Sequence, residues 1–178
     1  AGFAESETPG GYDPFLQAQD VPEAIYTEAA TIAGDRAYVP VTSSFAGHRF
    51  LVTLAREKGS WAILRVTQRP EQVVASFYGW YTHLEENALV SGTYSTRQDL
   101  SERFIAEVAA TLESFATSET PGGYDPILLA QDVPVEVRAQ VATYSETGAT
   151  VTLEMLWGGN PTPTIRTVEL VLGPLGWQ

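Results

Sequence analysis

Hydrophobic residues recur at helical spacing near the middle of the chain. Val73, Phe77, Tyr81 and Leu84 fall on one face of a helix with about 3.6 residues per turn. A proline followed by a glutamate opens this stretch, and both are typical of a first helical turn. The pattern predicts a helix over about residues 70–89.

A second apolar stripe follows after a short interruption. Residues 87–94 contain Gly92 and are expected to form a loop. Thr96 followed by Asp99 resembles a capping box, so a second helix is expected over about residues 97–116. Its stripe consists of Leu100, Phe104, Ile105, Val108, Leu112 and Phe115.

A long segment of the sequence occurs twice. Residues 3–22 read FAESETPGGYDPFLQAQDVP, and residues 115–134 read FATSETPGGYDPILLAQDVP. The correspondence continues without a gap from Ala37 and Ala149 until a short insertion at residues 160–163 shifts the frame. After the insertion Val52 matches Val168, Leu54 matches Leu170 and Trp61 matches Trp177. The chain therefore contains an internal duplication.

The remaining segments show the two-residue period of β-strands. Val135, Val137, Ala139 and Val141 alternate with polar residues. The matching stretch, residues 24–32, is rich in Ala and Glu, but its repeat partner favours a strand. Turns are expected at Gly34-Asp35 and Lys58-Gly59. Further strands are expected at residues 36–42, 49–56, 60–66, 149–157 and 164–172.

These elements predict an α+β fold made of two related modules, each a curved antiparallel sheet. Residues 1–68 supply a first module with its sheet portion only, and residues 69–178 supply a second with helices plus sheet. The helix pair is expected to pack on a sheet. An apolar sheet face left in water costs roughly 25 cal/mol per Å². We therefore expect the first sheet to be covered by helices that precede it, by the other module or by a second chain in a homodimer.

Charge and composition exclude several functions. The net charge is −12 and the calculated pI about 4.4, which argues against binding to nucleic acids or anionic membranes. The chain has no cysteine, so disulfides and thiolate chemistry are excluded. No apolar run reaches the roughly 18 residues that span a bilayer. Neither a metal site nor a cofactor is predicted.

Several motifs together resemble a known bacterial family. Phe77-Tyr78-Gly79-Trp80-Tyr81 is followed by Tyr124-Asp125-Pro126, then by residues 130–134 (AQDVP), and Gly176-Trp177 enters the last strand. This pattern resembles the family named domain of unknown function 3828. The resemblance covers most of the second copy and parts of the first. It implies a cystatin-like, nuclear-transport-factor-like α+β cone and an extracytoplasmic location, periplasmic, secreted or lipid-anchored. It implies no reaction.

The duplicated motif carries the main candidates for catalysis. Asp13 or Asp125 could act as a general base in an apolar pocket, with Gln19 or Gln131 as a hydrogen-bond donor. The alternative is that each Asp, which precedes a proline, accepts hydrogen bonds from nearby backbone N–H groups. Duplicated copies would keep a residue needed for folding as readily as a catalytic one.

The histidines and aromatic residues allow two interpretations each. His83 on the first helix is a candidate acid–base group or an exposed histidine, and His48 lies in an expected loop. The spacing of the two fits no zinc motif. The aromatic residues of the first helix could line a ligand pocket or form the core. The candidate ligand-binding residues are Tyr78, Trp80, Tyr81, Tyr124 and Gln131.

The sequence favours a non-catalytic, extracytoplasmic binding or interaction module. Its partner would be a protein, a peptide, a glycan or a small apolar ligand. One alternative is a small pocket enzyme of the isomerase or dehydratase type that uses an Asp base. Another is a structural repeat of an adhesive array.

Overall fold

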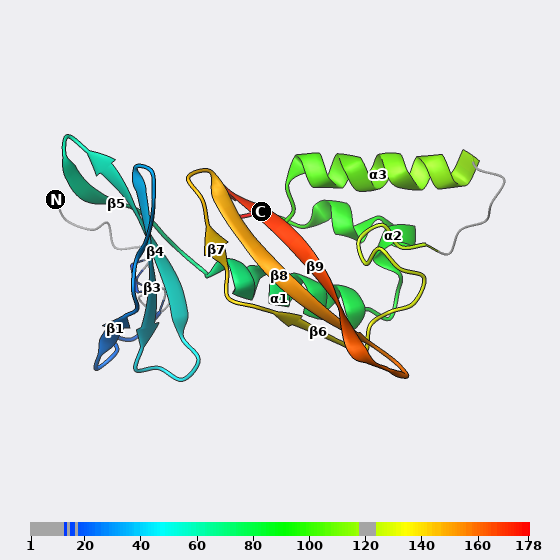
Figure 1. Cartoon of the computed structure of the whole chain (residues 1–178), viewed down its shortest axis with the longest axis horizontal. Coiled ribbons are helices and arrows are strands. Elements are labelled where there is room, and N and C mark those ends of the chain that lie inside the picture. Colours follow the sequence, from blue (N-terminus) through cyan, green and yellow to red (C-terminus); the bar gives the residue numbers. More distant parts are fainter. Residues whose placement is uncertain (1–12, 14, 17, 118–123) are drawn as a thin grey trace. The chain divides into compact units, whose positions relative to one another are not determined.

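The computed structural model describes residues 13, 15–16, 18–117 and 124–178. The protein is an α+β chain with two antiparallel sheets (Figure 1). The chain divides into two compact units. Unit 1 comprises residues 1–69 together with Tyr144–Glu146, and unit 2 comprises Pro70–Thr143 and Thr147–Gln178.

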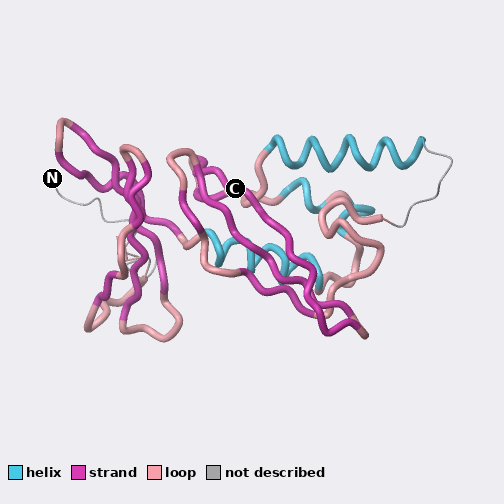
Figure 2. The backbone as a smooth tube through the Cα atoms, in the orientation of Figure 1, coloured by secondary structure: helices cyan, strands magenta, loops and turns pink. Residues whose placement is uncertain are grey.

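Unit 1 is built on a single sheet of short and medium strands (Figure 2). The strands are β1 (Ile25–Thr27), β2 (Thr31–Ala33), β3 (Arg36–Ser43), β4 (Arg49–Glu57) and β5 (Ser60–Thr67). They pair in the order β1–β3–β4–β5, with β2 also pairing to β3. Lys58 and Gly59 have φ of 50° and 83° and form the turn between β4 and β5, as predicted. The three long strands of this unit were predicted to within one residue.

The prediction of one strand over residues 24–32 was wrong. Two short strands stand there, β1 and β2, and residues 28–30 between them have no regular structure. Glu28 follows β1, still donates its N–H to the Pro40 carbonyl at 2.9 Å, and accepts a hydrogen bond of 2.6 Å from Arg69 at its carboxylate. The buried Arg69 guanidinium also donates to the backbone oxygen of Val41 at 3.0 Å and to Thr42 at 3.2 Å. Arg69 therefore connects Glu28, which follows the edge strand β1, to Val41 and Thr42 on β3.

The second sheet, all of which except Tyr144 belongs to unit 2, has the same order of strands. They are β6 (Glu136–Ala139), β7 (Thr143–Tyr144), β8 (Gly148–Trp157), β9 (Asn160–Gly173) and β10 (Gly176–Trp177). Their order is β10–β9–β8–β6, with β7 also pairing to β8. Each strand of unit 2 therefore has its counterpart in unit 1. Strand β6 is shorter than the strand predicted over residues 135–141. Val135 and Val141, at the two ends of the predicted strand, lie outside β6 and are exposed.

The insertion at residues 160–163 extends a hairpin. In unit 1 the residues between β3 and β4 form a loop, which Ser43 and His48 close through a backbone hydrogen bond of 3.1 Å. In unit 2 the corresponding stretch, with its extra residues, continues the β8–β9 ladder to the pair Trp157 and Asn160. Strand β9 consequently starts earlier than the predicted residue 164, at Asn160.

Three helices and one 3₁₀ turn lie between the two sheets in sequence. They are α1 (Pro70–Thr82), α2 (Ala88–Ser91), η1 (Thr93–Thr96) and α3 (Glu102–Thr117). The predicted first helix, residues 70–89, is therefore too long. Thr82 Oγ1 bonds back to the Tyr78 carbonyl at 2.8 Å, and Glu85 and Glu86, which follow, are unfavourable at the negative end of a helix dipole. Leu84, placed on the helical stripe by its spacing, lies outside α1.

Residues 87–94 were predicted as a loop, but they contain α2 and the start of η1. The Asn87 side chain caps α2 by accepting hydrogen bonds from the backbone N–H groups of Leu89 at 2.9 Å and Val90 at 3.3 Å. Gly92, with φ of 74°, ends this short helix in the left-handed conformation. Asn87 is therefore the N-cap of α2, a role that the predicted loop did not include.

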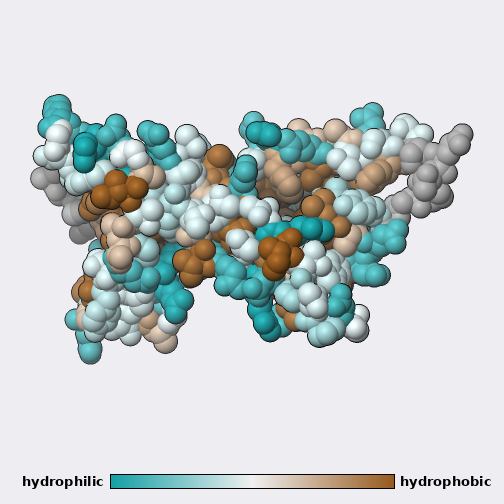
Figure 3. Space-filling view, in the orientation of Figure 1, coloured by the Kyte–Doolittle hydropathy of each residue, from teal (hydrophilic) through white to brown (hydrophobic). Residues whose placement is uncertain are grey.

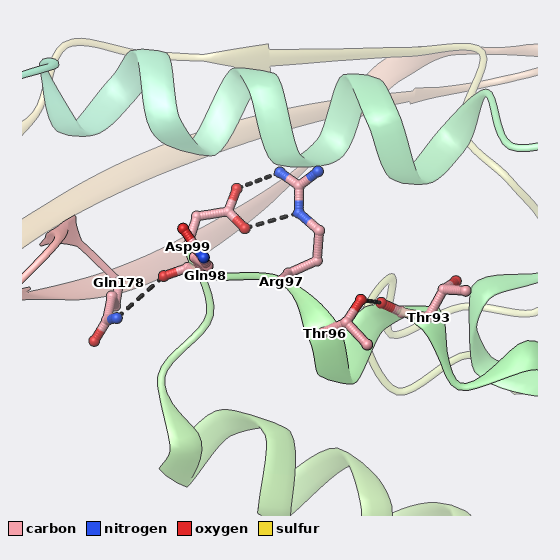
Figure 4. A network of polar contacts seen from close by, with 6 residues as sticks. All are labelled: Thr93, Thr96, Arg97, Gln98, Asp99 and Gln178. Carbon is pink, nitrogen blue, oxygen red and sulfur yellow. Dashed lines mark hydrogen bonds and ion pairs between the residues drawn. The ribbon is translucent and has the colours of Figure 1, made fainter. Parts of the chain in front are cut away.

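The predicted capping box at Thr96 and Asp99 is also wrong. Thr96 donates to the Thr93 carbonyl at 2.9 Å, and the Asp99 carboxylate pairs with Arg97 (Figure 4). Helix α3 begins later than predicted, and Ser101 caps it by accepting the N–H of Phe104 at 3.2 Å.

Helix α1 covers the inner face of the unit 2 sheet, where it contacts β6 and β8 (Figure 1). Its residues Val74, Phe77, Tyr78 and Tyr81 are buried. The facing side chains of β8 alternate as predicted and are buried: Ala149, Val151, Leu153 and Met155. This contact is the core of unit 2.

Candidate functional site

The duplicated Tyr-Asp-Pro motif forms the same turn in both copies. Asp125 Oδ1 accepts the backbone N–H groups of Ile127 at 2.7 Å and Leu128 at 2.9 Å. Asp13 Oδ1 accepts those of Phe15 at 2.7 Å and Leu16 at 3.1 Å. In each copy the Asp N–H also donates to the alanine carbonyl five residues on, at 2.7 and 2.8 Å. Both carboxylates thus organise the local backbone.

In unit 2 this turn is attached to α1 by two tyrosines. Tyr81 donates its hydroxyl to Asp125 Oδ2 at 2.6 Å, and Tyr78 donates to the Ile127 carbonyl at 3.4 Å. Burial and the Asp125 carboxylate raise the pKa of Tyr78 to about 12, and they also raise the pKa of Tyr81 above its usual value. Both tyrosines are therefore neutral donors at physiological pH.

The aromatic residues of α1 form a cluster at the edge of the core. The Phe77 ring lies 5.2 Å from the Tyr78 ring, 5.8 Å from that of Trp80 and 5.7 Å from that of Tyr81. The Arg97 guanidinium lies 4.5 Å from the Trp80 ring centroid, within cation–π range. Arg97 is held there by a forked ion pair with Asp99 (Figure 4).

A cavity of about 630 Å³ lies between α1, α3 and the sheet of unit 2. Its walls include Val74, Phe77, Tyr78, Phe104, Val108 and Leu170. The cavity exists because α3 does not pack closely on the sheet: Val108 is its only buried residue, and Phe104, Ile105, Leu112 and Phe115 are half-buried. Figure 3 shows hydrophobic side chains gathered below α3.

Arg166 is one of the charged residues on the wall of this cavity. It lies on β9 opposite Leu153, on the inner face of the sheet, in line with Val168 and Leu170. Its Nε is buried and has no hydrogen-bond partner among the described residues. Its Nη1 donates a long hydrogen bond of 3.5 Å to the Ile165 carbonyl. The guanidinium is therefore available to an anionic group in the cavity.

Two of the three acidic residues on the cavity wall are paired with other arginines, and the third is the exposed Glu169. Asp99 pairs with Arg97, and Glu107 accepts a hydrogen bond of 2.8 Å from Arg103. Hydrogen bonding to Glu107 and the charges of Glu107 and Glu169 raise the pKa of Arg103. These pairings leave the positive charge of Arg166 without a close carboxylate partner among the described residues.

The predicted ligand-binding residues are only partly brought together. Tyr78 lines the cavity, whereas Trp80 and Tyr81 belong to the aromatic cluster beside it. Tyr124 is exposed and meets Phe115 edge-on at 6.0 Å, and Gln131 is exposed. Asp125 is not among the cavity residues, although Pro126 and Ile127 after it are.

The two histidines lie apart from this site. His83 is exposed at the end of α1, with Nδ1 2.9 Å from the Gly79 carbonyl. His48 belongs to unit 1, where its Nδ1 lies 2.7 Å from Ser43 Oγ. Nowhere in the described part of the chain do three metal-binding side chains gather.

Sequence reasoning missed Arg166. A signal was present, because the residue stands at an inward position of a predicted strand, in alternation with Val168 and Leu170. A charged side chain at a core position points to a partner or a ligand.

Comparisons of the chain with protein-family models, with curated proteins and with solved structures find no match. Among the described helices, none combines the length and apolar character needed to cross a membrane.

Proposed function

We propose that unit 2 is a non-catalytic binding module whose cavity takes a small apolar ligand bearing a carboxylate. The observation that carries the proposal is the apolar cavity of about 630 Å³ with the unpaired Nε of Arg166 on its wall. This volume lies within the range of roughly 300–1,000 Å³ typical of small-molecule sites. Apolar walls supply affinity, and the planar guanidinium suits a carboxylate.

The placement of the acidic residues supports a binding role over catalysis. Asp125 accepts three hydrogen bonds from the turn and from Tyr81, and it does not line the cavity. Asp99 and Glu107 on the cavity wall are held in ion pairs, and Glu169, also on the wall, is exposed to solvent. None of these carboxylates has the apolar surroundings that would raise its pKa for general-base catalysis.

The family resemblance fits this proposal. A helix on the inner face of a curved antiparallel sheet is the arrangement expected of a cystatin-like or nuclear-transport-factor-like cone, and such folds hold ligands between helix and sheet. We include in the proposal the fold assignment, membership of the resembled family and an extracytoplasmic location.

A matched pair of ligands tests the proposal. Decanoate and decanol have the same alkyl chain and differ in charge, so titration calorimetry on the full chain separates the two contributions. We expect decanoate to bind at least tenfold more tightly than decanol. Arg166→Leu should remove that preference and leave decanol binding unchanged, because only the anion uses the guanidinium.

The control variant is Arg138→Leu. Arg138 is also a strand arginine, but it is exposed and pairs with Glu136 at 2.7 Å, away from the cavity. It should leave both affinities unchanged. Val168→Trp, which fills the cavity, should abolish binding of both ligands. The proposal fails if wild-type protein binds neither ligand, or if Val168→Trp binds them as wild type does.

A further inference from the structure

The cavity of unit 2 follows strand β9. The residues of β9 on its wall form one continuous run from Arg166 to Val171, and within this run Arg166, Val168 and Leu170 lie on the inner face of the sheet. A strand advances about 3.3 Å per residue, so Arg166 and Leu170 lie about 13 Å apart. The guanidinium of Arg166 therefore stands at one end of the wall that β9 supplies.

Helix α3 lines the cavity over a similar length. The residues of this helix on the cavity wall begin at Arg103 and end at Thr111. A helix rises about 1.5 Å per residue, so these positions cover about 12 Å. The two lengths agree, and they describe a cavity that extends along both elements.

The start of α3 lies beside the end of β9. Gln178 donates its backbone N–H to Val171 of β9 at 3.0 Å. Its side chain donates to the carbonyl of Gln98, which precedes α3, at 3.1 Å (Figure 4). The end of the cavity that lies away from Arg166 is therefore the end at which α3 begins.

The two ends of the cavity differ in chemistry. At one end Arg166 presents a buried Nε that has no hydrogen-bond partner among the described residues. The wall at the other end holds two leucines and two acidic residues: Leu100, Leu170, Asp99 and Glu169. A carboxylate is favoured at the first end, whereas a second carboxylate would meet apolar side chains and like charges at the other.

The arginines near the acidic end are already paired. Arg103 donates to Glu107 at 2.8 Å, and Arg97 forms the forked pair with Asp99. Each of these arginines would have to leave its carboxylate partner before it could bind a carboxylate of the ligand.

We infer that the ligand class is the unbranched monocarboxylate of about ten carbons, with its carboxylate at Arg166 and its chain along β9 toward Leu170. An extended alkyl chain advances about 1.25 Å per carbon, given bonds of about 1.5 Å at near-tetrahedral angles, so about ten carbons fill the cavity. The inference rests on the proposed function, to which it adds the length, the orientation and the single charge of the ligand.

A series of carboxylates tests the length by titration calorimetry on the full chain. From hexanoate through octanoate to decanoate, affinity should rise about fourfold with each CH₂ group, because each added group is buried against the apolar wall. From decanoate to tetradecanoate it should change by no more than about twofold, because the added carbons extend beyond the cavity.

A dicarboxylate of the same length tests the single charge. Decanedioate should bind at least about tenfold more weakly than decanoate, because its second carboxylate would lie beside Leu170 and Glu169 without a free cation.

Leu100→Trp tests the orientation. Leu100 is half-buried, so a larger side chain should fill the cavity at the end away from Arg166. The variant should bind decanoate at least about tenfold more weakly, because the end of the chain loses its place on the apolar wall. It should bind hexanoate as wild type does, which also shows that it is folded. Ile165→Trp is the matched control: Ile165 is 53% exposed on the outer face of the second sheet, and its substitution should change neither affinity.

Three results would overturn the inference: affinities that do not depend on chain length, decanedioate that binds as tightly as decanoate, or Leu100→Trp that weakens hexanoate and decanoate equally. If decanoate in those cases still binds more tightly than decanol and requires Arg166, the proposed function stands without this inference. If no carboxylate of the series binds, both are wrong.

Discussion

The pairing of β8 with β9 requires a residue without a side chain at position 148, and Gly148 stands there. A β-carbon built at this position would lie 2.2 Å from the backbone oxygen of Leu170 on the neighbouring strand. A backbone oxygen in the middle of a ladder cannot move aside without breaking its own hydrogen bonds. The glycine therefore permits β8 and β9 to approach each other at the start of β8.

We predict that Gly148→Ala lowers the free energy of unfolding by about 1–3 kcal/mol. Gly79→Ala is the control, since its β-carbon would meet nothing within 4 Å and it lies on the exposed side of α1. Alanine is the better helix former, so this variant should gain up to about 1 kcal/mol. Urea denaturation measures both, and equal stabilities of the two variants would contradict the steric argument.

Tyr81 and Asp125 are a second pair whose behaviour follows from residue chemistry. The raised pKa values of Tyr81 and Tyr78 mean that the folded protein keeps phenol protons that the unfolded chain releases above about pH 10. Their contribution to stability is therefore complete below that pH and is lost as the pH rises above it.

We predict that Tyr81→Phe costs about 1–2 kcal/mol of stability at neutral pH, because Asp125 loses a donor. The variant should also show a shallower loss of stability than wild type between about pH 9 and pH 11, as it has one fewer raised phenol pKa. Tyr26→Phe, at an exposed tyrosine, is the control. Denaturation curves at several pH values give the comparison, and parallel losses in Tyr81→Phe and wild type would refute the assignment.

At the scale of the elements, α3 is a long helix with little buried surface. Of its predicted apolar stripe, Val108 is buried, Phe104 and Val108 border the cavity, and Ile105, Leu112 and Phe115 are half-buried. With few tertiary contacts, a helix depends more on its own caps. Ser101, which accepts the Phe104 N–H, is the cap of α3.

We predict that Ser101→Ala lowers stability by about 1 kcal/mol and speeds hydrogen exchange of the amides in the first turn of α3. Thr96→Ala is the control, because Thr96 bonds only backwards to Thr93 and caps nothing in α3. If the two variants exchange alike, Ser101 is not the functional start of this helix.

The errors in predicted elements share a cause. The stripe of α1 continues by spacing to Leu84, but the helix ends at Thr82, where side-chain bonding and the acidic residues that follow oppose another turn. The predicted strand at residues 24–32 is interrupted at residues 28–30, where the Glu28 carboxylate accepts a hydrogen bond from Arg69, distant in sequence. Periodicity describes the faces of an element, while its ends depend on caps and on tertiary contacts.

At the scale of the whole molecule, the duplicated sequence is reflected in both sheets but not in the helices. Both units build sheets of the same strand order and identical Asp turns, since each depends on residues within its own copy. Among the residues that the structure describes, the helices belong to unit 2 only.

The sequence by itself determined the repeat, the long strands and their turns, and the two apolar helical stripes; for Asp13 and Asp125 it offered backbone bonding as one of two alternatives. These depend on short-range periodicity and on local hydrogen bonding. Only the tertiary structure decided that α3 stands off the sheet, that a cavity opens there and that Arg166 lies on its wall. A residue pattern states which side of an element is apolar, but the distance between two such sides depends on how all their side chains pack together.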